Sequence, residues 1–210
     1  MSAVAERVRV IPMGLSPYEP TFHAMREFTA RRNADTADEL WLLEHPPVYT
    51  LGLAADPTHG PKNEPENERG IPVVQVDRGG EITYHGPGQV VLYTLVDLAR
   101  RGIKVKQFVA MLEQSVIDLL GSRAERKPGA PGIYVGGAKI AALGIRVSRG
   151  CAFHGLALNV DMDLAPFTAI NPCGFPGLQV TQTRELGIRE GARSLGDRLA
   201  GILIGKLEHA

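Results

Sequence analysis

The stretch GIYVGGAKIAALGIRVSRGCAFHGLALNV, residues 132–160, decides the fold. It holds three runs rich in β-branched and other apolar residues, and short breaks at Gly136-Gly137 and Arg149-Gly150 separate them. Strand-forming runs joined by such short glycine turns are typical of antiparallel hairpins. We therefore expect a three-strand meander over 132–135, 138–147 and 152–160.

Further strands precede the meander. Polar and apolar residues alternate, or apolar residues run together, in segments bounded by Pro and Gly. These patterns predict strands over 7–11, 39–44, 48–51, 73–76, 81–84 and 89–98. Pro12 and Gly14 are expected to end the first strand, and 39–51 fits either one kinked strand or two, because His45-Pro46-Pro47 interrupts it. Residues 52–70 read as a long surface loop.

Helical periodicity appears in three places. Apolar residues recur on one face over 18–33, 104–120 and 192–207, and Gly121 stands where a C-terminal cap would. Together with the strands, this predicts an α/β (α+β) fold with mixed β-sheets flanked by helices. A chain of 210 residues is long enough for one well-buried core, so we expect a single catalytic domain over 1–210.

Composition excludes several classes of protein. The 23 Lys and Arg residues balance the 23 Asp and Glu residues, which argues against binding to nucleic acid or to an anionic membrane surface. No apolar run approaches the roughly 20 residues that span a bilayer, and the N-terminus has no apolar signal segment. We expect a cytoplasmic monomer whose two cysteines, Cys151 and Cys173, are free thiols.

Two residues suggest nucleophilic chemistry. Cys173 lies between Pro172 and Gly174, on backbone that is neither helix nor strand, so its thiol is presented to solvent or substrate. Lys139 is the only charge in a run of glycine and alanine, and an ammonium near a thiol favours the thiolate. The alternatives are a small buried cysteine after a turn and a lysine that protects a sheet edge.

His85 and His154 each precede a glycine, which leaves room for a substrate beside the ring. The alternative is that both are polar groups satisfied by backbone bonds in turns. A zinc site built from His85, His154 and Cys173 lacks the usual ligand spacing, and no phosphate-binding loop is present. We therefore expect neither a metal nor ATP.

Four motifs in order carry a resemblance to a known family. They are RGGEITYHGPGQ at 78–89, GAKIAALG at 137–144, HGLALNV at 154–160 and NPCG at 171–174. Over roughly residues 40–182, the chain resembles the lipoyl(octanoyl) transferase family. The resemblance implies the fold of biotin- and lipoate-protein ligase catalytic domains, with a core over roughly 35–210.

The resemblance also implies site residues. Cys173 matches the family's acyl-thioester nucleophile, Lys139 matches the lysine that lowers its pKa, and His154 is a supporting residue. Ala142-Leu143-Gly144 departs from many relatives, which carry Ser or Ala followed by Ile. The implied substrate-binding residues are Arg78, Gly79, Gly80, Glu81, Ile82, Thr83, Tyr84, His85, Ala142, Leu143, Gly144, Gly155, Leu156 and Ala157.

The implied reaction begins the lipoylation of proteins. An octanoyl or lipoyl group arrives as an acyl carrier protein thioester, passes to Cys173, and is transferred to a lysine of an apo lipoyl domain. The implied acceptors are the lipoyl domains of 2-oxoacid dehydrogenase complexes and the glycine cleavage H protein. Either Lys139 or His85 could accept the proton of the attacking amine. The rival functions are an ATP-dependent lipoate or biotin ligase and a carrier-binding scaffold without turnover.

Small residues in these motifs are expected to leave space for an alkyl chain. The alternative is that they serve close backbone packing only. The residues are Gly79, Gly80, Ala141, Ala142, Gly155 and Ala157.

Overall fold

A computed structural model describes residues 8–56, 70–170 and 177–210 of the chain. The larger of its two sheets has seven strands in the order β1-β2-β6-β10-β9-β8-β7. Along that order they are β1 (Val8–Leu15), β2 (Asp38–Glu44), β6 (Gln89–Asp97), β10 (Cys151–Asn159), β9 (Ala138–Ser148), β8 (Ala130–Val135) and β7 (Glu125–Lys127). The smaller sheet consists of β4 (Val73–Gln75), β3 (Val48–Leu51) and β5 (Ile82–His85).

The predicted meander is confirmed: β8, β9 and β10 pair antiparallel in sequence order. Beyond them, β10 pairs antiparallel with β6 and β6 with β2, whereas β1 runs parallel to β2. The sheet is therefore mixed, as predicted. Its central strands β6 and β10 are buried along almost their whole length, which explains their nearly continuous apolar sequence.

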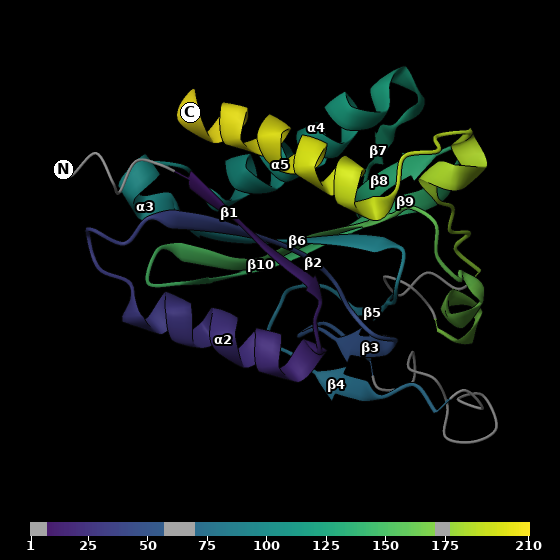
Figure 1. The fold of residues 1–210 in the computed structure, drawn as a ribbon, viewed down its shortest axis with the longest axis horizontal. Coiled ribbons are helices and arrows are strands. Elements are labelled where there is room, and N and C mark those ends of the chain that lie inside the picture. The colour runs from purple at the N-terminus through teal and green to yellow at the C-terminus, as the bar shows by residue number, and fades with distance from the viewer. Residues whose placement is uncertain (1–7, 57–69, 171–176) are drawn as a thin grey trace.

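Helices cover both faces of the large sheet, with α4 and α5 on one face and α2 on the other (Figure 1). The core under α4 and α5 includes Leu112 and Leu199, and the core under α2 includes Met25, each with 0% of its surface exposed. The three predicted helices are thus confirmed. The helices are α2 (Tyr18–Arg31), α3 (Leu98–Arg101), α4 (Val105–Leu120) and α5 (Ala192–Glu208), and the 3₁₀ turns are η2 (Gly121–Arg123), η3 (Ala165–Ala169) and η5 (Thr183–Leu186).

The first strand is longer than the sequence predicts. It was expected to end at Pro12, but β1 continues to Leu15 through a register shift between Pro12 and Gly14. Proline is tolerated here because β1 is an edge strand, so the missing N–H interrupts no second ladder. The open question at 39–51 is also answered: β2 and β3 are two strands, and they belong to different sheets.

A buried ion cluster joins α2, β2 and α3. The Asp38 carboxylate, with none of its side chain exposed, contacts the guanidinium groups of Arg32, Arg100 and Arg101. The Asp97 amide also donates to Asp38 Oδ1, at 2.9 Å. Because each arginine additionally donates to a backbone carbonyl, the cluster also ties these elements to β6 at Leu95 and to α5 at Leu207.

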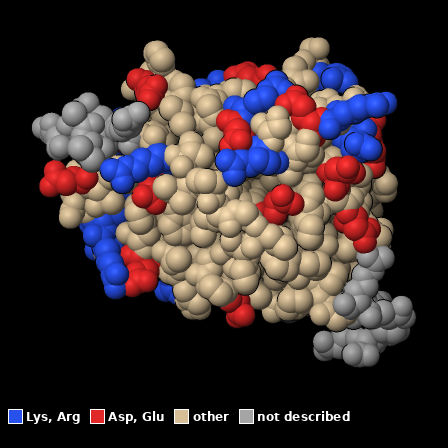
Figure 2. Space-filling model, viewed as in Figure 1, with Lys and Arg blue, Asp and Glu red and all other residues tan. Residues whose placement is uncertain are grey.

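Acidic and basic side chains are interspersed on the face shown in Figure 2, and neither sign forms a continuous area there. This agrees with the balanced composition of the whole chain. Among the described helices, none is both long and apolar enough to cross a membrane.

Candidate active site

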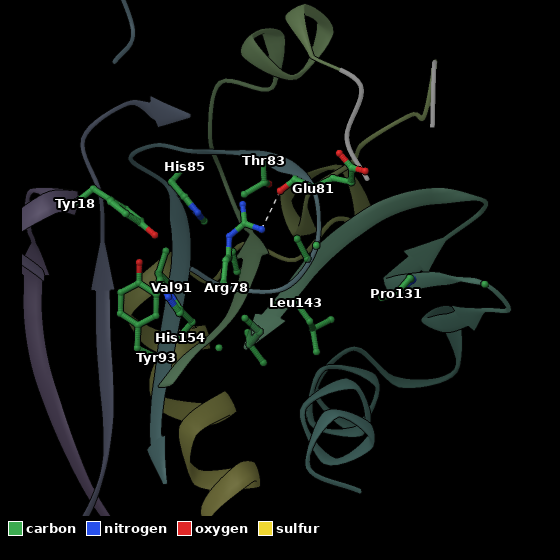
Figure 3. Close-up of a pocket in the computed structure, with 17 residues that line it drawn as sticks. Tyr18, Arg78, Glu81, Thr83, His85, Val91, Tyr93, Pro131, Leu143 and His154 are labelled. Carbon is green, nitrogen blue, oxygen red and sulfur yellow. Dashed lines mark hydrogen bonds between the residues drawn. The ribbon is translucent and has the colours of Figure 1, made fainter. Parts of the chain in front are cut away.

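A cavity with a volume of ≈ 250 Å³ lies between the large sheet and the segment 78–85 (Figure 3). Its walls come from α2, the 78–85 segment, β6, β9, β10, the start of β8 and the turn before it. Apolar side chains and glycines make most of the lining, and tyrosine, histidine and arginine side chains add polar groups. The lining residues are Tyr18, Arg78, Gly80, Glu81, Thr83, His85, Val91, Tyr93, Gly129, Pro131, Ala142, Leu143, Gly144, His154, Gly155, Leu156 and Ala157.

Two rows of residues cross the sheet beneath the cavity. Strand register places Ala157 between Val91 and Ala142. The second row, two residues along each strand, contains Tyr93, Gly155 and Gly144. The small residues that β9 and β10 contribute to these rows leave a shallow apolar channel on this face of the sheet.

Two of these glycines are also required by backbone packing. A Cβ on Gly155 would lie 2.1 Å from the Leu92 carbonyl oxygen, and one on Gly144 would lie 2.8 Å from the Gly79 carbonyl oxygen. Neither position accepts a side chain without backbone movement. Space for a ligand and close packing are therefore both consequences of these glycines.

Arg78 holds together segment 78–85, which forms the roof of the cavity, across from the large sheet. Its buried guanidinium donates to the carbonyl oxygens of Glu81 at 2.9 Å and Thr50 at 2.8 Å, and to Thr50 Oγ1 at 2.8 Å. The Gly79 amide donates to the Ile145 carbonyl at 3.0 Å, which fastens the roof to β9. Arg78 thus contributes a positive charge to the lining and fixes the segment that carries it.

Alternation along β5 sorts the predicted residues between two sides. Thr83 and His85 line the cavity. Ile82 and Tyr84 lie instead in a separate core with Tyr49. Gly79 is also absent from the lining, and Ala141 lies in the core under α4 and α5. The structure therefore brings most of the predicted substrate-binding residues to one cavity and leaves Gly79, Ile82 and Tyr84 outside its walls.

Lys139 lies next to the cavity wall. Only 4% of its surface is exposed, and its Nζ donates to the carbonyl oxygen of Pro131, a lining residue, at 2.9 Å. The ammonium also lies 5.3 Å from the centre of the Tyr134 ring. The amino group of Lys139 is thus held at the edge of the cavity lining and is largely shielded from solvent.

Cys173 lies outside the described residues, as do its neighbours from 171 to 176. The chain on its C-terminal side is placed: Lys139 N–H donates to Gln179 O at 2.8 Å, and Thr181 N–H donates to Lys139 O at 2.9 Å. On its N-terminal side, Ile170 is buried in the core that holds Tyr49. The described chain that continues from Cys173 thus pairs directly with the predicted catalytic lysine.

His85 is buried and held by polar side chains. Its Nδ1 lies 2.7 Å from Gln89 Oε1, and its Nε2 lies 3.5 Å from Thr50 Oγ1. Burial lowers the pKa of His85 to about 3, and the nearby His45 adds to this effect. The ring is consequently neutral at physiological pH.

His154 has a strained backbone that turns its ring toward the cavity. Its φ of 61° lies in the left-handed region. Strict alternation would place it with Ala152 and Leu156, under α4 and α5, but its ring stacks on Phe22 of α2, with centroids 5.5 Å apart. Thr94 Oγ1 donates to the His154 carbonyl at 3.0 Å, where the β6–β10 ladder is interrupted. Such strain is common at functional sites.

Asp77 orients the His154 ring through a side-chain hydrogen bond. Nε2 of His154 lies 2.9 Å from Asp77 Oδ1, and Nδ1 has no hydrogen-bond partner within the described chain. Burial lowers the pKa of His154, although the carboxylate opposes this. Burial would raise the pKa of Asp77, but the hydrogen bond and charge of His154 outweigh it, so that pKa is lowered.

Tyr18 and Tyr93 bring two further polar groups to the cavity, and their hydroxyls point toward each other (Figure 3). Burial raises the pKa of Tyr18 to about 12. Tyr93 Oη lies 2.7 Å from Nε2 of His45, whose Nδ1 lies 2.6 Å from the Ser16 carbonyl. Burial lowers the pKa of His45 to about 4, so it too is neutral.

Sequence reasoning missed several of these residues. Tyr18, Tyr93, Asp77 and Pro131 lie outside the four sequence motifs, although Asp77 directly precedes the motif at 78–89. The only signals are the polar groups of Tyr18 at the start of a helix and of Tyr93 within an otherwise apolar strand. Among the described residues, no three His, Cys, Asp or Glu side chains gather as metal ligands; the cluster of His85, His154 and Cys173 involves a residue beyond that part of the chain.

Residues 17–195 match the family model of the lipoyl protein ligase A/B catalytic domain. The chain is 56% identical to an octanoyltransferase from Dechloromonas aromatica, over 93% of this chain and 95% of that one. It is 60% identical to one from Thiobacillus denitrificans, over 89% and 87%. Its fold is similar to a lipoate-protein ligase A solved with bound ATP, with a TM-score of 0.75, 15% identity and coverage of 96% and 85%.

Proposed function

This chain belongs to the octanoyltransferase family, built on the lipoyl protein ligase A/B catalytic domain, and we propose that it carries the octanoyl group on Cys173. The enzyme transfers an octanoyl group in protein lipoylation. The observation that supports the cysteine route is the pairing of Lys139 with Gln179–Thr181, the described chain that continues from Cys173. The nucleophile and its activating ammonium then act at one wall of the cavity.

The cavity supplies the binding energy for the acyl chain. Its floor of Ala142, Ala157 and Val91 is apolar, and each methylene removed from water contributes about 0.8 kcal/mol. We assign the substrate-binding role to the lining residues of segments 78–85, 142–144 and 155–157. Gly79, Ile82 and Tyr84 support that wall from behind.

The reaction has two half-reactions. The Cys173 thiolate attacks the thioester carbonyl of an octanoyl carrier, the carrier thiolate leaves, and an octanoyl-cysteine forms. A lysine amine of a lipoyl domain then attacks that carbonyl, and the sulfur leaves. Exchange of one thioester for another is nearly neutral in energy, so the first step needs positioning and a thiolate more than a strong acid.

ATP is not consumed in this scheme, because a thioester is already activated for acyl transfer. The similarity to an ATP-bound ligase reflects the shared fold at 15% identity. The carrier is an acyl carrier protein, the acceptors are apo lipoyl domains of 2-oxoacid dehydrogenase complexes and the H protein, and the reaction takes place in the cytoplasm on a monomeric enzyme.

Intact-mass measurement tests the proposal. The chain is mixed with octanoyl-acyl carrier protein without ATP or added metal, and the expected result is one octanoyl adduct per molecule that Cys173→Ala abolishes. An apo lipoyl domain then removes the adduct and gains the same mass. Transfer that requires octanoic acid and ATP, without an adduct on the enzyme, would instead identify a ligase.

A further inference from the structure

A chain of buried side-chain hydrogen bonds begins at His85 and ends beside Lys139. His85 Nδ1 lies 2.7 Å from Gln89 Oε1, and Gln89 Nε2 donates to Asn159 Oδ1 at 2.9 Å. Asn159 Nδ2 donates to the Thr181 carbonyl at 3.0 Å. The four residues are all buried, and Thr181 is the residue whose N–H pairs with Lys139 O.

The carbonyl at the end of this chain fixes the direction of every bond. Thr181 O can only accept, so Asn159 must present its NH₂ group there and its Oδ1 to Gln89. Gln89 Nε2 therefore donates to Asn159, and its second N–H reaches the Tyr84 carbonyl at 3.2 Å. Gln89 is left with its oxygen facing His85, so the hydrogen between them belongs to His85 Nδ1.

The consequence is a defined tautomer. With the hydrogen on Nδ1, Nε2 of His85 carries a lone pair and can only accept. Its neighbour Thr50 Oγ1 accepts from Arg78 and keeps its own O–H as a donor, but it lies 3.5 Å from Nε2, longer than an ordinary hydrogen bond. Burial keeps the ring neutral, as its lowered pKa of about 3 indicates, so Nε2 is not protonated under the conditions of transfer.

We propose that Gln89 and Asn159 are positioning residues that hold His85 as a hydrogen-bond acceptor for the attacking lysine amine. This inference rests on the proposed function. The neutral amine donates one N–H to His85 Nε2, which directs its lone pair at the octanoyl carbonyl. The C–N bond forms, the C–S bond breaks, and a nitrogen proton passes to the departing Cys173 sulfur, which regenerates the thiol.

The tautomer can be measured without any turnover. Two-dimensional ¹H–¹⁵N correlation of the imidazole rings distinguishes Nδ1–H from Nε2–H, and His85→Gln assigns the signals. We expect neutral Nδ1–H in the wild type from pH 5 to 8. Asn159→Asp keeps an acceptor for Gln89 Nε2, so this tautomer should persist, whereas Gln89→Leu removes the acceptor of His85 and should favour Nε2–H. A wild-type ring with Nε2–H, or a protonated ring, overturns the proposal.

Single-turnover kinetics tests the consequence for the reaction. Gln89→Leu should slow transfer from the octanoyl-enzyme to the lipoyl domain about tenfold or more relative to its acylation step, the effect of one lost transition-state hydrogen bond. The exposed Gln107→Leu is the matched control and should change neither step. Equal slowing of both half-reactions overturns the assignment. If the wild type forms no octanoyl adduct, the proposed function fails instead, and the spectroscopic result still stands.

Discussion

The Thr181 amide donates a 2.9 Å hydrogen bond to the carbonyl of Lys139, and Val180 forms a parallel bridge with the same lysine. An irregular segment is thereby locked onto β9 at the residue whose ammonium is buried beside the cavity. The lysine's place in the site depends on this backbone pairing as well as on its side chain.

Lys139→Ala should slow alkylation of Cys173 at neutral pH, because it removes the amino group that we propose favours the thiolate. We expect the rate of iodoacetamide labelling to shift toward higher pH, and octanoyl-enzyme formation to slow in parallel. Lys139→Arg keeps the charge and should recover part of the rate. An unchanged pH profile in the alanine variant would show that the lysine and the thiol are not coupled.

Cys151 should remain unlabelled in the folded protein. It is 7% exposed, its Sγ donates to the Arg149 carbonyl at 3.8 Å, and burial raises the pKa of its thiol. We therefore expect one labelled thiol in the native state and two after denaturation, by intact mass. Cys151→Ser should retain most activity, and a loss as large as that of Cys173→Ala, with an unchanged circular dichroism spectrum, would contradict this assignment.

The fold followed from local patterns, which is why most of it could be predicted. Alternation and glycine turns identify the β8–β9–β10 meander, and helical spacing identifies α4 and α5, because each element's sequence matches its own burial. The continuation of β1 past Pro12 was missed because edge-strand status is a property of the sheet, which local sequence does not contain.

The site was predictable only where its residues share motifs. The segments around His85, Lys139 and Gly155 could be placed together by resemblance, but Asp77 could not be linked to His154 from a distance of 77 residues along the chain. The positive φ of His154 likewise reverses the face that alternation predicts. Side-chain contacts that form only when distant segments pack together leave no periodic pattern in a single sequence.

Asp38→Asn should destabilise the fold by about 3–5 kcal/mol, because it leaves the guanidinium groups of Arg32, Arg100 and Arg101 buried without a counter-charge. Urea denaturation measures this loss. The matched control is Asp118→Asn, which removes an ion pair with the partly exposed Lys206 and should cost at most about 1 kcal/mol. Equal effects of the two substitutions would show that the buried cluster contributes no more than a surface pair.

Stability should fall as the pH drops from 7 to 5. His45, His85 and His154 all have pKa values lowered by burial, to about 4 for His45 and about 3 for His85. Below pH 6.5 the unfolded chain binds protons that the folded chain does not, so the free energy of unfolding decreases with falling pH in this window. Urea titrations at intervals between pH 5 and 7 measure the slope.

His45→Gln should make that slope shallower, because one proton fewer is taken up on unfolding. The exposed His23→Gln serves as the control and should leave it unchanged. Equal slopes for the wild type and His45→Gln would mean that folding does not lower the pKa of His45.

Ala157→Phe should shift donor preference toward shorter acyl chains. Ala157 is 4% exposed and lies at the centre of the channel floor, between Val91 and Ala142, so a ring there occupies the path of an alkyl chain. Each methylene kept in water costs about 0.8 kcal/mol of binding, so dodecanoyl and octanoyl donors should lose more rate than butanoyl. Ala141→Val is the control: it enlarges a neighbour on β9 that faces the core under α4 and α5, and it should lower stability without changing the ratio of rates. Transfer rates measured with butanoyl-, octanoyl- and dodecanoyl-acyl carrier protein give this ratio. A uniform loss of rate across the three chain lengths in Ala157→Phe would rule out a channel past this residue.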